Sequence, residues 1–530
     1  MTPSYHTALI GGPRNNFLLA ASISVASLLA LGLVAVTMGG SDGPGAKPSS
    51  GRRKHSRRRV QKTFIRGLYN LGNTCFLNST LQSLASLPAF NEYVDACATL
   101  LMDSVNQASA SITADAAIIF RLKDVLGQLK PQARRVPAYS PSGLIGSLSK
   151  KGKWMSSRNE QDAQELFQLV SSTLQATRRE MGASLFNSGF LSQNAPIESS
   201  IISTASSLTN QTNNPHIPNP LQGMAASRIA CVKCGYTAAI RHFTFDNLSL
   251  TVPRKQKTTV EECLSVYTVI DHLDDFKCRH CTLSATLVQI KWDMAQHTAD
   301  LDKLRDSPKR AKRLTETIKT LTEQQDRLEH ALANNPEDSL KGIELVSPQP
   351  GMSTKQTMIA RTPRVLALHL SRSIFMPSGD VLKNSASVRL QPLLDISPFT
   401  TTGHITTSAS KPISGPAVAM SQDNSERLAY AQRNNCLYRL SAVVVHAGNH
   451  NSGHYSAYRR VRPAASDESG DENADEGLSA NEKDNNNVSK QSLLDDGSIW
   501  FMASDTQTIE VSEITVMSSG DAYLLFYERL

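Results

Sequence analysis

The chain has 530 residues, of which 40% are hydrophobic and 19% are charged, which is sufficient for a large buried core. Seven of its eight net positive charges come from one basic run at residues 51–62, GRRKHSRRRVQK, which contains no acid. The rest of the chain is therefore nearly neutral, and the composition does not support a nucleic-acid-binding surface.

Eight cysteines are too few for a disulfide scaffold in a chain of this length. Four of them form two C-x-x-C pairs, a pattern that indicates a metal site in a reducing compartment. The folded part of the chain is therefore expected to face the cytosol.

The N-terminal region contains a candidate membrane anchor. After a short tail, residues 1–16, the 22 residues at 17–38 (FLLAASISVASLLALGLVAVTM) contain no charge. As a helix they would be about 33 Å long, which matches a hydrocarbon core of about 30 Å. One alternative is a cleaved signal peptide, although its apolar part is usually only about 7–15 residues long. The other is a buried core helix, for which the flanking residues offer no packing partners. A single-pass transmembrane helix is the favoured interpretation.

The charges around this segment predict its orientation. Arg14 is the only charged residue before it, whereas the basic run follows inside residues 39–63, a Gly-, Pro- and Ser-rich stretch that indicates a flexible linker. Because basic residues favour the cytosolic side, the bulk of the chain is predicted to be cytosolic. The basic run would bind anionic lipid head groups, or alternatively act as a nuclear localisation patch.

One folded region is expected from residue 64 to residue 530, interrupted by polar inserts near 187–222, 396–435 and 464–497. The third insert is acidic and nearly free of aromatic residues, so it is predicted to be disordered. All three are predicted to be loops of one fold rather than domains.

The first motif of this region is GLYNLGNTCFLNSTLQSL, residues 67–84. A helix is predicted over 75–87, with Asn73 or Thr74 as its N-cap. Leucines share one face of that helix: Leu77, Leu81 and Leu84. Cys75 would lie in the first turn, where the helix dipole favours a thiolate. A buried structural cysteine would suit the same position, so this motif alone does not identify a nucleophile.

The two cysteine pairs, CVKC and CRHC, are separated by 43 residues. Two such knuckles complete the tetrahedral sulfur site that zinc favours. The predicted ligands of one structural zinc are Cys231, Cys234, Cys278 and Cys281. The segment 241–252, RHFTFDNLSLTV, is predicted to form one of two long strands that carry the knuckles. His280 could replace one ligand, but a bystander role is preferred.

An amphipathic helix is predicted from Arg313 to Asn334, within a helical insert at about 292–335. Its apolar residues recur on one face: Leu314, Ile318, Leu321, Leu328 and Leu332. A hairpin that packs on itself or on the domain is favoured over a coiled coil that binds a partner.

Strand patterns gather toward the C-terminus. RVLALHLSRS at 364–373 alternates apolar and polar residues, LYRLSAVVVHAG and HYSAYRRVR flank NHNSG as a hairpin, and AYLLFYER closes the chain. Helical patterns come earlier, at 75–87 and 159–180. Helices followed by strands predict an α+β fold with two sub-lobes.

His454 follows a glycine at the edge of the predicted hairpin. Papain-like folds build their nucleophile from a cysteine and a histidine that are far apart in the sequence. A lone histidine is more often a surface or core residue, so it is the combination of Cys75 and His454 that indicates a thiol enzyme.

These motifs resemble those of the ubiquitin-specific proteases. Residues 67–84 are similar to the cysteine box of that family, residues 438–460 to its histidine box, and Trp500–Phe501 with the closing AYLLFYER to the end of its domain. The paired C-x-x-C motifs are similar to the zinc ribbon of the family.

The resemblance covers about residues 64–530 and implies a papain-like cysteine protease fold with thumb, palm and zinc-ribbon fingers, the fingers at about 225–290. The anchor, the basic run and the domain order are similar to the family member anchored in the mitochondrial outer membrane. That membrane is therefore the expected location, with the endoplasmic reticulum as the alternative.

The resemblance also implies the reaction, hydrolysis of isopeptide bonds at the C-terminal glycine of ubiquitin. Cys75 would attack the carbonyl to form a thioester, and His454 would take the thiol proton and return it to the leaving lysine amine. Asn70 would be the amide of the oxyanion hole. In NEQDAQELF, Asp162 and Glu165 would contact the tail of ubiquitin, although ordinary surface acids of a helix are the alternative.

The third catalytic residue departs from the family pattern W-x-x-F-D-D. WFMASDTQTIEV places Ser504 where the acid is expected and Asp505 next to it. Ser504 is predicted to orient His454, with Asp505 as the alternative. A serine can accept the imidazole N–H bond but adds no charge, so a lower turnover is expected.

The sequence therefore predicts a membrane-anchored deubiquitinase that acts on membrane-associated ubiquitinated proteins, with one structural zinc and no catalytic cofactor. A catalytically weak or inert ubiquitin-binding scaffold is one alternative, supported by the uncharged third residue and the long insert before it. A protease for a ubiquitin-like modifier is the other. The presence of Cys75, His454 and Asn70 favours the active enzyme.

Overall fold

The structure is a computed structural model that describes residues 62–108, 113–151, 161–187, 218–303, 307–347, 350–401, 404–414, 424–450, 452–463, 493–494 and 496–530. The predicted transmembrane helix at 17–38 lies outside these residues, as do nearly all of the basic linker and most of the insert at 464–497. Where the chain is described, no helix is both long and apolar enough to cross a membrane. All described residues belong to the unit Val60–Leu530.

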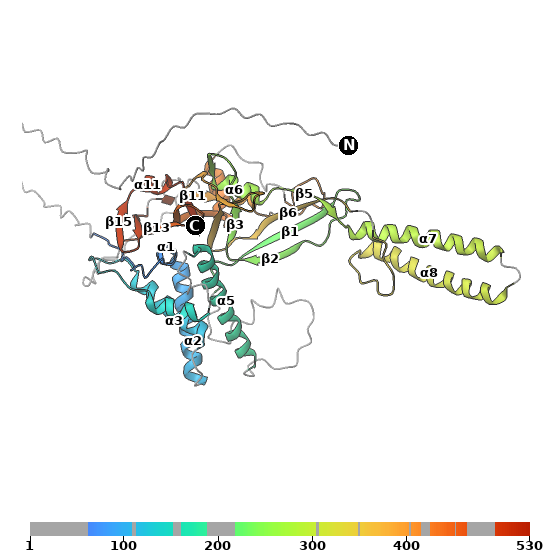
Figure 1. Ribbon diagram of the computed structural model, residues 1–530, viewed down its shortest axis with the longest axis horizontal. Coiled ribbons are helices and arrows are strands. Elements are labelled where there is room, and N and C mark those ends of the chain that lie inside the picture. The colour runs from blue at the N-terminus through green and yellow to red at the C-terminus, as the bar shows by residue number, and fades with distance from the viewer. Residues whose placement is uncertain are drawn as a thin grey trace, which may run out of the picture. The chain divides into compact units, whose positions relative to one another are not determined.

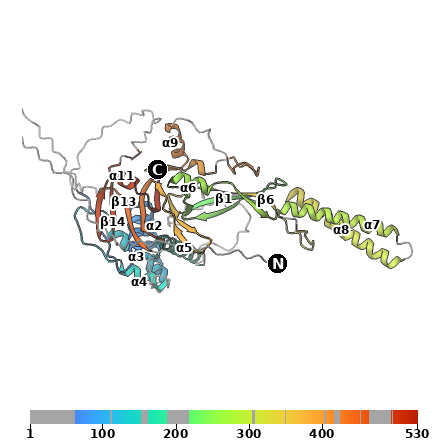
Figure 2. The same ribbon diagram turned by 45° about the horizontal axis from the view of Figure 1, so that its top comes forward.

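The described chain begins with helices, shown in Figures 1 and 2: α1 (Cys75–Leu84), α2 (Pro88–Ala108), α3 (Ala114–Gln128), α4 (Ser142–Lys151) and α5 (Ala163–Asn187). The predicted helix over 75–87 ends earlier than expected, at Leu84. Pro88 is the first residue of α2 and disfavours helical backbone at the residue before it, so the chain turns between the two helices.

An eight-stranded sheet follows in the order β15-β14-β13-β12-β16-β7-β3, with β11 paired to β12. Its strands are β3 (Leu248–Thr251), β7 (Val365–Ser371), β11 (Leu393–Asp395), β12 (Leu437–Gly448), β13 (Gly453–Val461), β14 (Ile499–Ser504), β15 (Gln507–Val511) and β16 (Ala522–Arg529). Only β3 and β7 pair in parallel among these strands. The predicted hairpin is confirmed as β12 and β13, closed by the pair Gly448 and Gly453.

Both faces of this sheet are buried. On β16, Leu524 and Phe526 join the hydrophobic cluster that contains residues of α1, α2, α3 and α5. The alternate residues Leu525 and Tyr527 join a second cluster on the opposite face. This packing of helices on a mostly antiparallel sheet confirms the α+β class.

A second, four-stranded sheet has the order β2-β1-β6-β5. Its strands are β1 (Gly223–Cys231), β2 (Arg241–Phe245), β5 (Asp271–Phe276) and β6 (Gly351–Arg361). The prediction of one long strand over 241–252 is wrong, because β2 and β3 lie in different sheets. Asp246 lies between β2 and β3, and its carboxylate accepts hydrogen bonds from Ser171 and Gln175 of α5. This contact with the helix interrupts the predicted strand.

The helical insert is a pair of helices, α7 (Arg279–Lys303) and α8 (Pro308–Asn334), which lie side by side in Figures 1 and 2. Their shared core contains Leu283, Ile290, Leu328 and Ala331. The helix α8 contains the predicted amphipathic segment. The insert begins earlier than residue 292, because α7 starts inside the second cysteine pair.

The remaining elements are short: β4 (Lys257–Thr259), α6 (Val260–Tyr267), β8 (Ser373–Phe375), β9 (Val381–Lys383), β10 (Ser387–Arg389), η2 (Ser397–Phe399), α9 (Asn424–Arg433) and α11 (Glu513–Met517). The expectation that 396–435 is only a loop is wrong where the chain is described. Ala431 of α9 is fully buried and packs in the second hydrophobic cluster.

Candidate active site

Cys75 is the first residue of α1 and is 3% exposed. The helix packs on β12, β13 and β14, so the cysteine is fixed against the strands that follow it by more than 360 residues in the sequence. Thr74, one of the two residues predicted as N-cap, is the N-cap of α1, although its side chain makes no capping hydrogen bond.

The loop before Cys75 is held by the side chain of Asn70. Asn70 Oδ1 accepts hydrogen bonds from the backbone N–H groups of Gly72 (3.1 Å) and Thr74 (3.0 Å). Gly72 has a φ of 98°, in the left-handed region that favours glycine. Gly67 is needed for a different reason, because a Cβ there would lie 2.5 Å from the carbonyl oxygen of Thr506.

His454 lies in β13 and Ser504 ends the neighbouring strand β14. His454 Nε2 and Ser504 Oγ are 2.8 Å apart, a hydrogen-bond distance. The register of the two strands places Ala457 opposite Ala503, which brings the residue after Ala503 toward the start of β13. Two residues that are 50 positions apart therefore meet through strand pairing.

Asp505 contacts different residues from Ser504, although the two are adjacent. Its carboxylate accepts hydrogen bonds from Asn70 Nδ2 (3.0 Å) and Asn78 Nδ2 (2.8 Å). Its backbone oxygen accepts from the N–H of Leu68 (2.8 Å). Asp505 therefore ties the β14–β15 turn to the loop that carries Cys75. Sequence reasoning missed Asn78, which is buried on α1 three residues after the cysteine.

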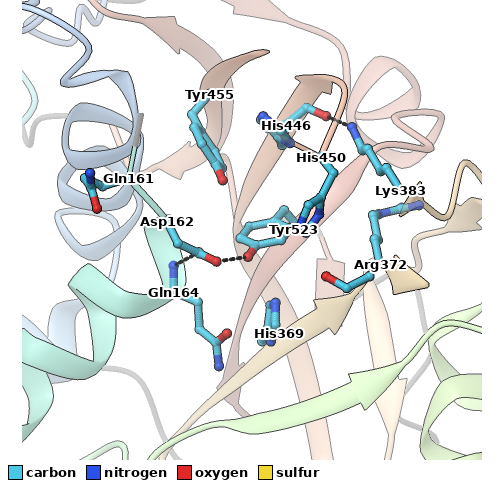
Figure 3. Close-up of a pocket in the computed structure, with 11 residues that line it drawn as sticks. Gln161, Asp162, Gln164, His369, Arg372, Lys383, His446, His450, Tyr455 and Tyr523 are labelled. Atoms are coloured by element: carbon cyan, nitrogen blue, oxygen red, sulfur yellow. Dashed lines mark hydrogen bonds between the residues drawn. The ribbon is translucent and has the colours of Figure 1, made fainter. Parts of the chain in front are cut away.

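A cavity of about 510 Å³ lies between the start of α5 and the strands of the central sheet (Figure 3). Its lining residues include Gln161, Asp162, His369, Lys383, His446 and Tyr523. Asp162 Oδ1 accepts from the N–H of Gln164 (2.7 Å) at the start of α5. Asp162 Oδ2 accepts from the hydroxyl of Tyr523 (2.6 Å), which Figure 3 shows as a bond across the pocket. Glu165 is exposed in the first turn of α5 and does not line this cavity.

Aromatic rings surround Tyr523 in this cavity. Its ring centroid lies 4.9 Å from that of His369, 6.2 Å from that of His446 and 5.7 Å from that of Tyr455. Burial lowers the pKa of both His369 and His446 to about 4, so both rings are neutral at pH 7. Burial, followed by the charge of Asp162, raises the pKa of Tyr523 and keeps it a hydrogen-bond donor. The sequence analysis did not single out these four residues.

The opposite wall of the cavity is basic. Lys383 Nζ donates to the backbone oxygens of His446 (2.7 Å) and Gly448 (2.9 Å). The buried guanidinium of Arg372 donates to backbone carbonyls, including that of Ala522 (2.9 Å). An anionic side and a cationic side therefore face each other across a neutral aromatic floor.

The four cysteines of the C-x-x-C pairs meet at the end of the four-stranded sheet, with their Sγ atoms all within 4.8 Å of one another. Cys231 and Cys281 Sγ are 4.0 Å apart, and Cys234 and Cys278 Sγ are 3.6 Å apart. Four thiolates at about 2.3 Å from one zinc ion would be about 3.8 Å apart, so the cluster fits that metal. His280 is not part of it, and its ring stacks on Tyr236 with centroids 5.6 Å apart.

Residues 66–527 match the family model described as ubiquitin carboxyl-terminal hydrolase. The chain is 24% identical over 525 residues to ubiquitin carboxyl-terminal hydrolase 30 of Mus musculus, which covers 89% of this chain and 86% of that protein. It is 27% identical over 442 residues to ubiquitin carboxyl-terminal hydrolase 16 of Emericella nidulans, which covers 76% of this chain and 62% of that protein.

Among solved structures, the SAGA Ubp8/Sgf11/Sus1/Sgf73 DUB module bound to ubiquitin aldehyde aligns with a TM-score of 0.48 and 17% identity, over 88% of this chain and 69% of that chain. The family model spans most of the chain and includes both the cysteine loop and the β13–β14 pair. The chain therefore belongs to the ubiquitin carboxyl-terminal hydrolase family, as a ubiquitin-specific protease with cysteine-type deubiquitinating peptidase activity.

Proposed function

We propose that this deubiquitinase hydrolyses isopeptide bonds at the C-terminal glycine of ubiquitin, with Cys75 as the nucleophile and His454 as the general base and acid. The observation that carries the proposal is the 2.8 Å contact of His454 Nε2 with Ser504 Oγ, on strands against which the helix of Cys75 packs. A histidine held in this way, on a strand that packs against a helix with a cysteine at its N-terminus, suits the arrangement that nucleophilic catalysis requires.

In the proposed reaction, His454 takes the proton of the Cys75 thiol, and the thiolate attacks the carbonyl carbon of the terminal glycine. The tetrahedral intermediate breaks the C–N bond, and His454 gives its proton to the leaving lysine amine. Water then attacks the thioester with His454 as the base, which releases the ubiquitin carboxylate and regenerates the thiol.

Ser504 is proposed to orient the imidazole. A hydroxyl can accept the Nε2–H bond, which leaves Nδ1 as the nitrogen that exchanges the proton with Cys75. Because serine is uncharged, it stabilises the imidazolium less than a carboxylate would, and turnover is expected to be modest.

Asn70 is proposed to donate an amide N–H to the developing oxyanion. The amide has two N–H bonds, of which one is directed at Asp505 and the second is the proposed donor. Asp505, bound to both Asn70 and Asn78, would hold this amide in place before substrate arrives. A preorganised donor of this kind is worth about 2.7–4 kcal/mol in other enzymes.

Asp162 and Glu165 are proposed to bind the arginine-rich tail of ubiquitin. Asp162 already accepts the hydroxyl of Tyr523, and a carboxylate has enough lone pairs to accept an arginine as well. The aromatic floor of the cavity would exclude water beneath the extended tail.

One structural zinc ion is proposed at Cys231, Cys234, Cys278 and Cys281, as the ribbon at the end of the fingers. The support is the near-tetrahedral spacing of the four sulfurs. The four ligands close the coordination sphere, so the site is proposed to stabilise the fold without taking part in the reaction.

The chain is further proposed to be anchored by residues 17–38 in the mitochondrial outer membrane, with membrane-associated ubiquitinated proteins as substrates. The support is the uncharged segment followed by the basic run. Deletion of 17–38 should move the protein to the soluble fraction, whereas continued membrane retention would contradict the anchor. A fluorescent fusion distinguishes the mitochondrial surface from the endoplasmic reticulum.

The central experiment is covalent capture. The full chain in detergent is mixed with ubiquitin that carries an electrophilic C-terminus, and a stable adduct is expected by mass spectrometry. Cys75→Ala should abolish the adduct, whereas Cys97→Ala, which removes another buried cysteine, should keep it. A wild-type chain that binds ubiquitin without an adduct would favour the scaffold, and preferential capture by a ubiquitin-like modifier would identify the other alternative.

A further inference from the structure

Arg459 is a fully buried cation in β13, five residues after His454 and 1% exposed. Its Nη1 donates to Gln82 Oε1 (2.8 Å) and to the backbone oxygen of Leu129 (3.2 Å), and its Nη2 donates to the backbone oxygen of Ala85 (3.4 Å). Where the chain is described, no carboxylate forms an ion pair with it, and its Nε has no hydrogen-bond partner.

The charge of Arg459 is balanced by the ends of two helices. Ala85 is the C-cap of α1 and Leu129 is the C-cap of α3. The last carbonyls of a helix carry a partial negative charge, so the guanidinium lies where two such ends meet. Burial lowers its pKa to about 10, which still leaves the side chain protonated at pH 7.

Gln82 extends this contact to a further segment. The side chain is 1% exposed in the last turn of α1, and its Nε2 donates to the backbone oxygen of Arg66 (2.7 Å). The contact between Arg459 and Gln82 therefore joins α1 and α3 to β13, and joins all three to the segment that leads into the cysteine loop.

This contact lies at the far end of the two elements that carry the proposed catalytic pair. The distance along α1 from Cys75 to Ala85 is about 15 Å, and that along β13 from His454 to Arg459 is about 17 Å. If α1 tilted by about 5° around this contact, Cys75 would move by about 1 Å relative to β13. A misplacement of about 1 Å is enough to cost about 10²-fold in rate.

We propose that Arg459 and Gln82 form a positioning pair that sets how the helix of Cys75 lies on the strand of His454. A buried cation without a carboxylate is poorly suited to stabilise a fold, because an apolar side chain of similar volume is often as stable. Because Arg459 contacts the C-terminus of α1, it can instead fix the orientation of the helix that carries Cys75. The inference rests on the proposed roles of Cys75 and His454.

The test compares Arg459→Met with the full wild-type chain in detergent, at a temperature where circular dichroism shows both folded. We expect kcat for a ubiquitin-derived fluorogenic substrate to fall about 10²-fold with KM changed less than about twofold, because the ubiquitin-binding surface is untouched. Alkylation of Cys75 by iodoacetamide should shift to higher pH, toward the profile of an unassisted thiol. Arg459→Lys should recover part of kcat, since it restores the charge at the two helix ends.

Arg228 provides a matched control. It is also 1% exposed and lies on β1 of the four-stranded sheet. Among the residues that the structure describes, it donates only to the backbone carbonyls of Thr406 and Lys411, and its Nε has no hydrogen-bond partner. Arg228→Met should leave kcat and the alkylation profile of Cys75 unchanged. Equal losses of kcat in the Arg228 and Arg459 variants would overturn the proposal, because they would show a general effect of a lost buried arginine.

A second variant keeps the proposal testable if Arg459→Met does not fold. Gln82→Leu should lower kcat in the same way, and adding it to Arg459→Lys should cause little further loss, because both act through one contact. Unchanged kcat in folded Gln82→Leu would overturn the positioning role. If the wild-type chain showed no activity, or if activity survived Cys75→Ala, the proposed nucleophile would be refuted. The contact between Arg459 and Gln82 would then be purely structural.

Discussion

The cysteine cluster and the candidate catalytic site are both built from distant segments, but they are assembled in different ways. The cluster uses four identical side chains whose mutual distances match one ion, and its ligands are evident from two C-x-x-C spacings. The catalytic site uses side chains whose contacts depend on a loop, a turn and a strand register. The first kind of site can be recognised from spacing, whereas the second depends on contacts that spacing does not encode.

The largest expected effect is on the catalytic site. His454→Ala should lower kcat by at least about 10⁴-fold, because no other group in the proposal moves the proton. The melting temperature should change little, since His454 is exposed near the start of its strand. His297→Ala on α7 is the control and should keep full activity. Residual turnover of His454→Ala within tenfold of wild type would contradict its role.

The division of roles between Ser504 and Asp505 is the next test. Asp505→Ala removes the acceptor of both Asn70 and Asn78, so kcat should fall about 10²–10³-fold, as for loss of an oxyanion donor. Ser504→Ala should cost only about tenfold, because it removes an uncharged acceptor of the imidazole. Steady-state kinetics of both variants measures the difference, and unchanged kcat in Ser504→Ala would contradict the orienting role.

Substitutions in the cysteine cluster should lower the stability of the fold rather than the catalytic rate. Cys278→Ser should reduce the zinc content from one ion per chain and lower Tm by about 5–10 °C, because metal binding contributes folding free energy. Elemental analysis and a thermal melt measure the two effects. Cys436→Ser, a buried cysteine outside the cluster, should keep its zinc. Full zinc content in Cys278→Ser would contradict the proposed ligand set.

The smallest expected effect is a pH dependence of stability from the aromatic cavity. His369 and His446 have a pKa of about 4 when folded, below the unfolded value of about 6.5, so the unfolded chain binds more protons between these values. The free energy of unfolding should therefore be highest above about pH 6.5, where neither state binds these protons, and should fall as the pH drops toward 4. The slope should be at most about 1.4 kcal/mol per pH unit for each histidine.

His446→Gln should reduce this slope, measured by urea titrations at several pH values between 4.5 and 7. These values cover most of the range between the folded pKa of about 4 and the unfolded pKa of about 6.5. A variant slope equal to that of wild type would show that His446 does not contribute to the pH dependence.

Much of the fold could be predicted from local patterns. The hairpin of β12 and β13, the C-terminal strand and the buried leucines of α1 follow from alternation and helical spacing. The strand predicted over 241–252 failed because its period-two pattern runs through Asp246, whose carboxylate is needed by two side chains of α5. No local pattern reports that requirement.

The same limit applies to the candidate site. The motifs singled out Cys75, His454 and the four cysteines. The four cysteines come together as predicted, and Cys75 and His454 lie on a helix and a strand that pack against each other. They could not separate Ser504 from Asp505, because adjacent residues in a turn point in directions set by its dihedral angles. Nor could they anticipate that Tyr523 binds Asp162, a contact between residues 361 positions apart.

The turn between β14 and β15 has a wider consequence. Ser504 pairs with Gln507, so only Asp505 and Thr506 form the turn, with Asp505 at a φ of 51°. Ser504 reaches His454, Asp505 reaches Asn70 and Asn78, and the backbone of Thr506 lies against Gly67. One short hairpin thus contacts both the proposed proton-transfer residues and the proposed oxyanion donor. Displacement of this turn is therefore expected to disturb both proposed parts of the site together.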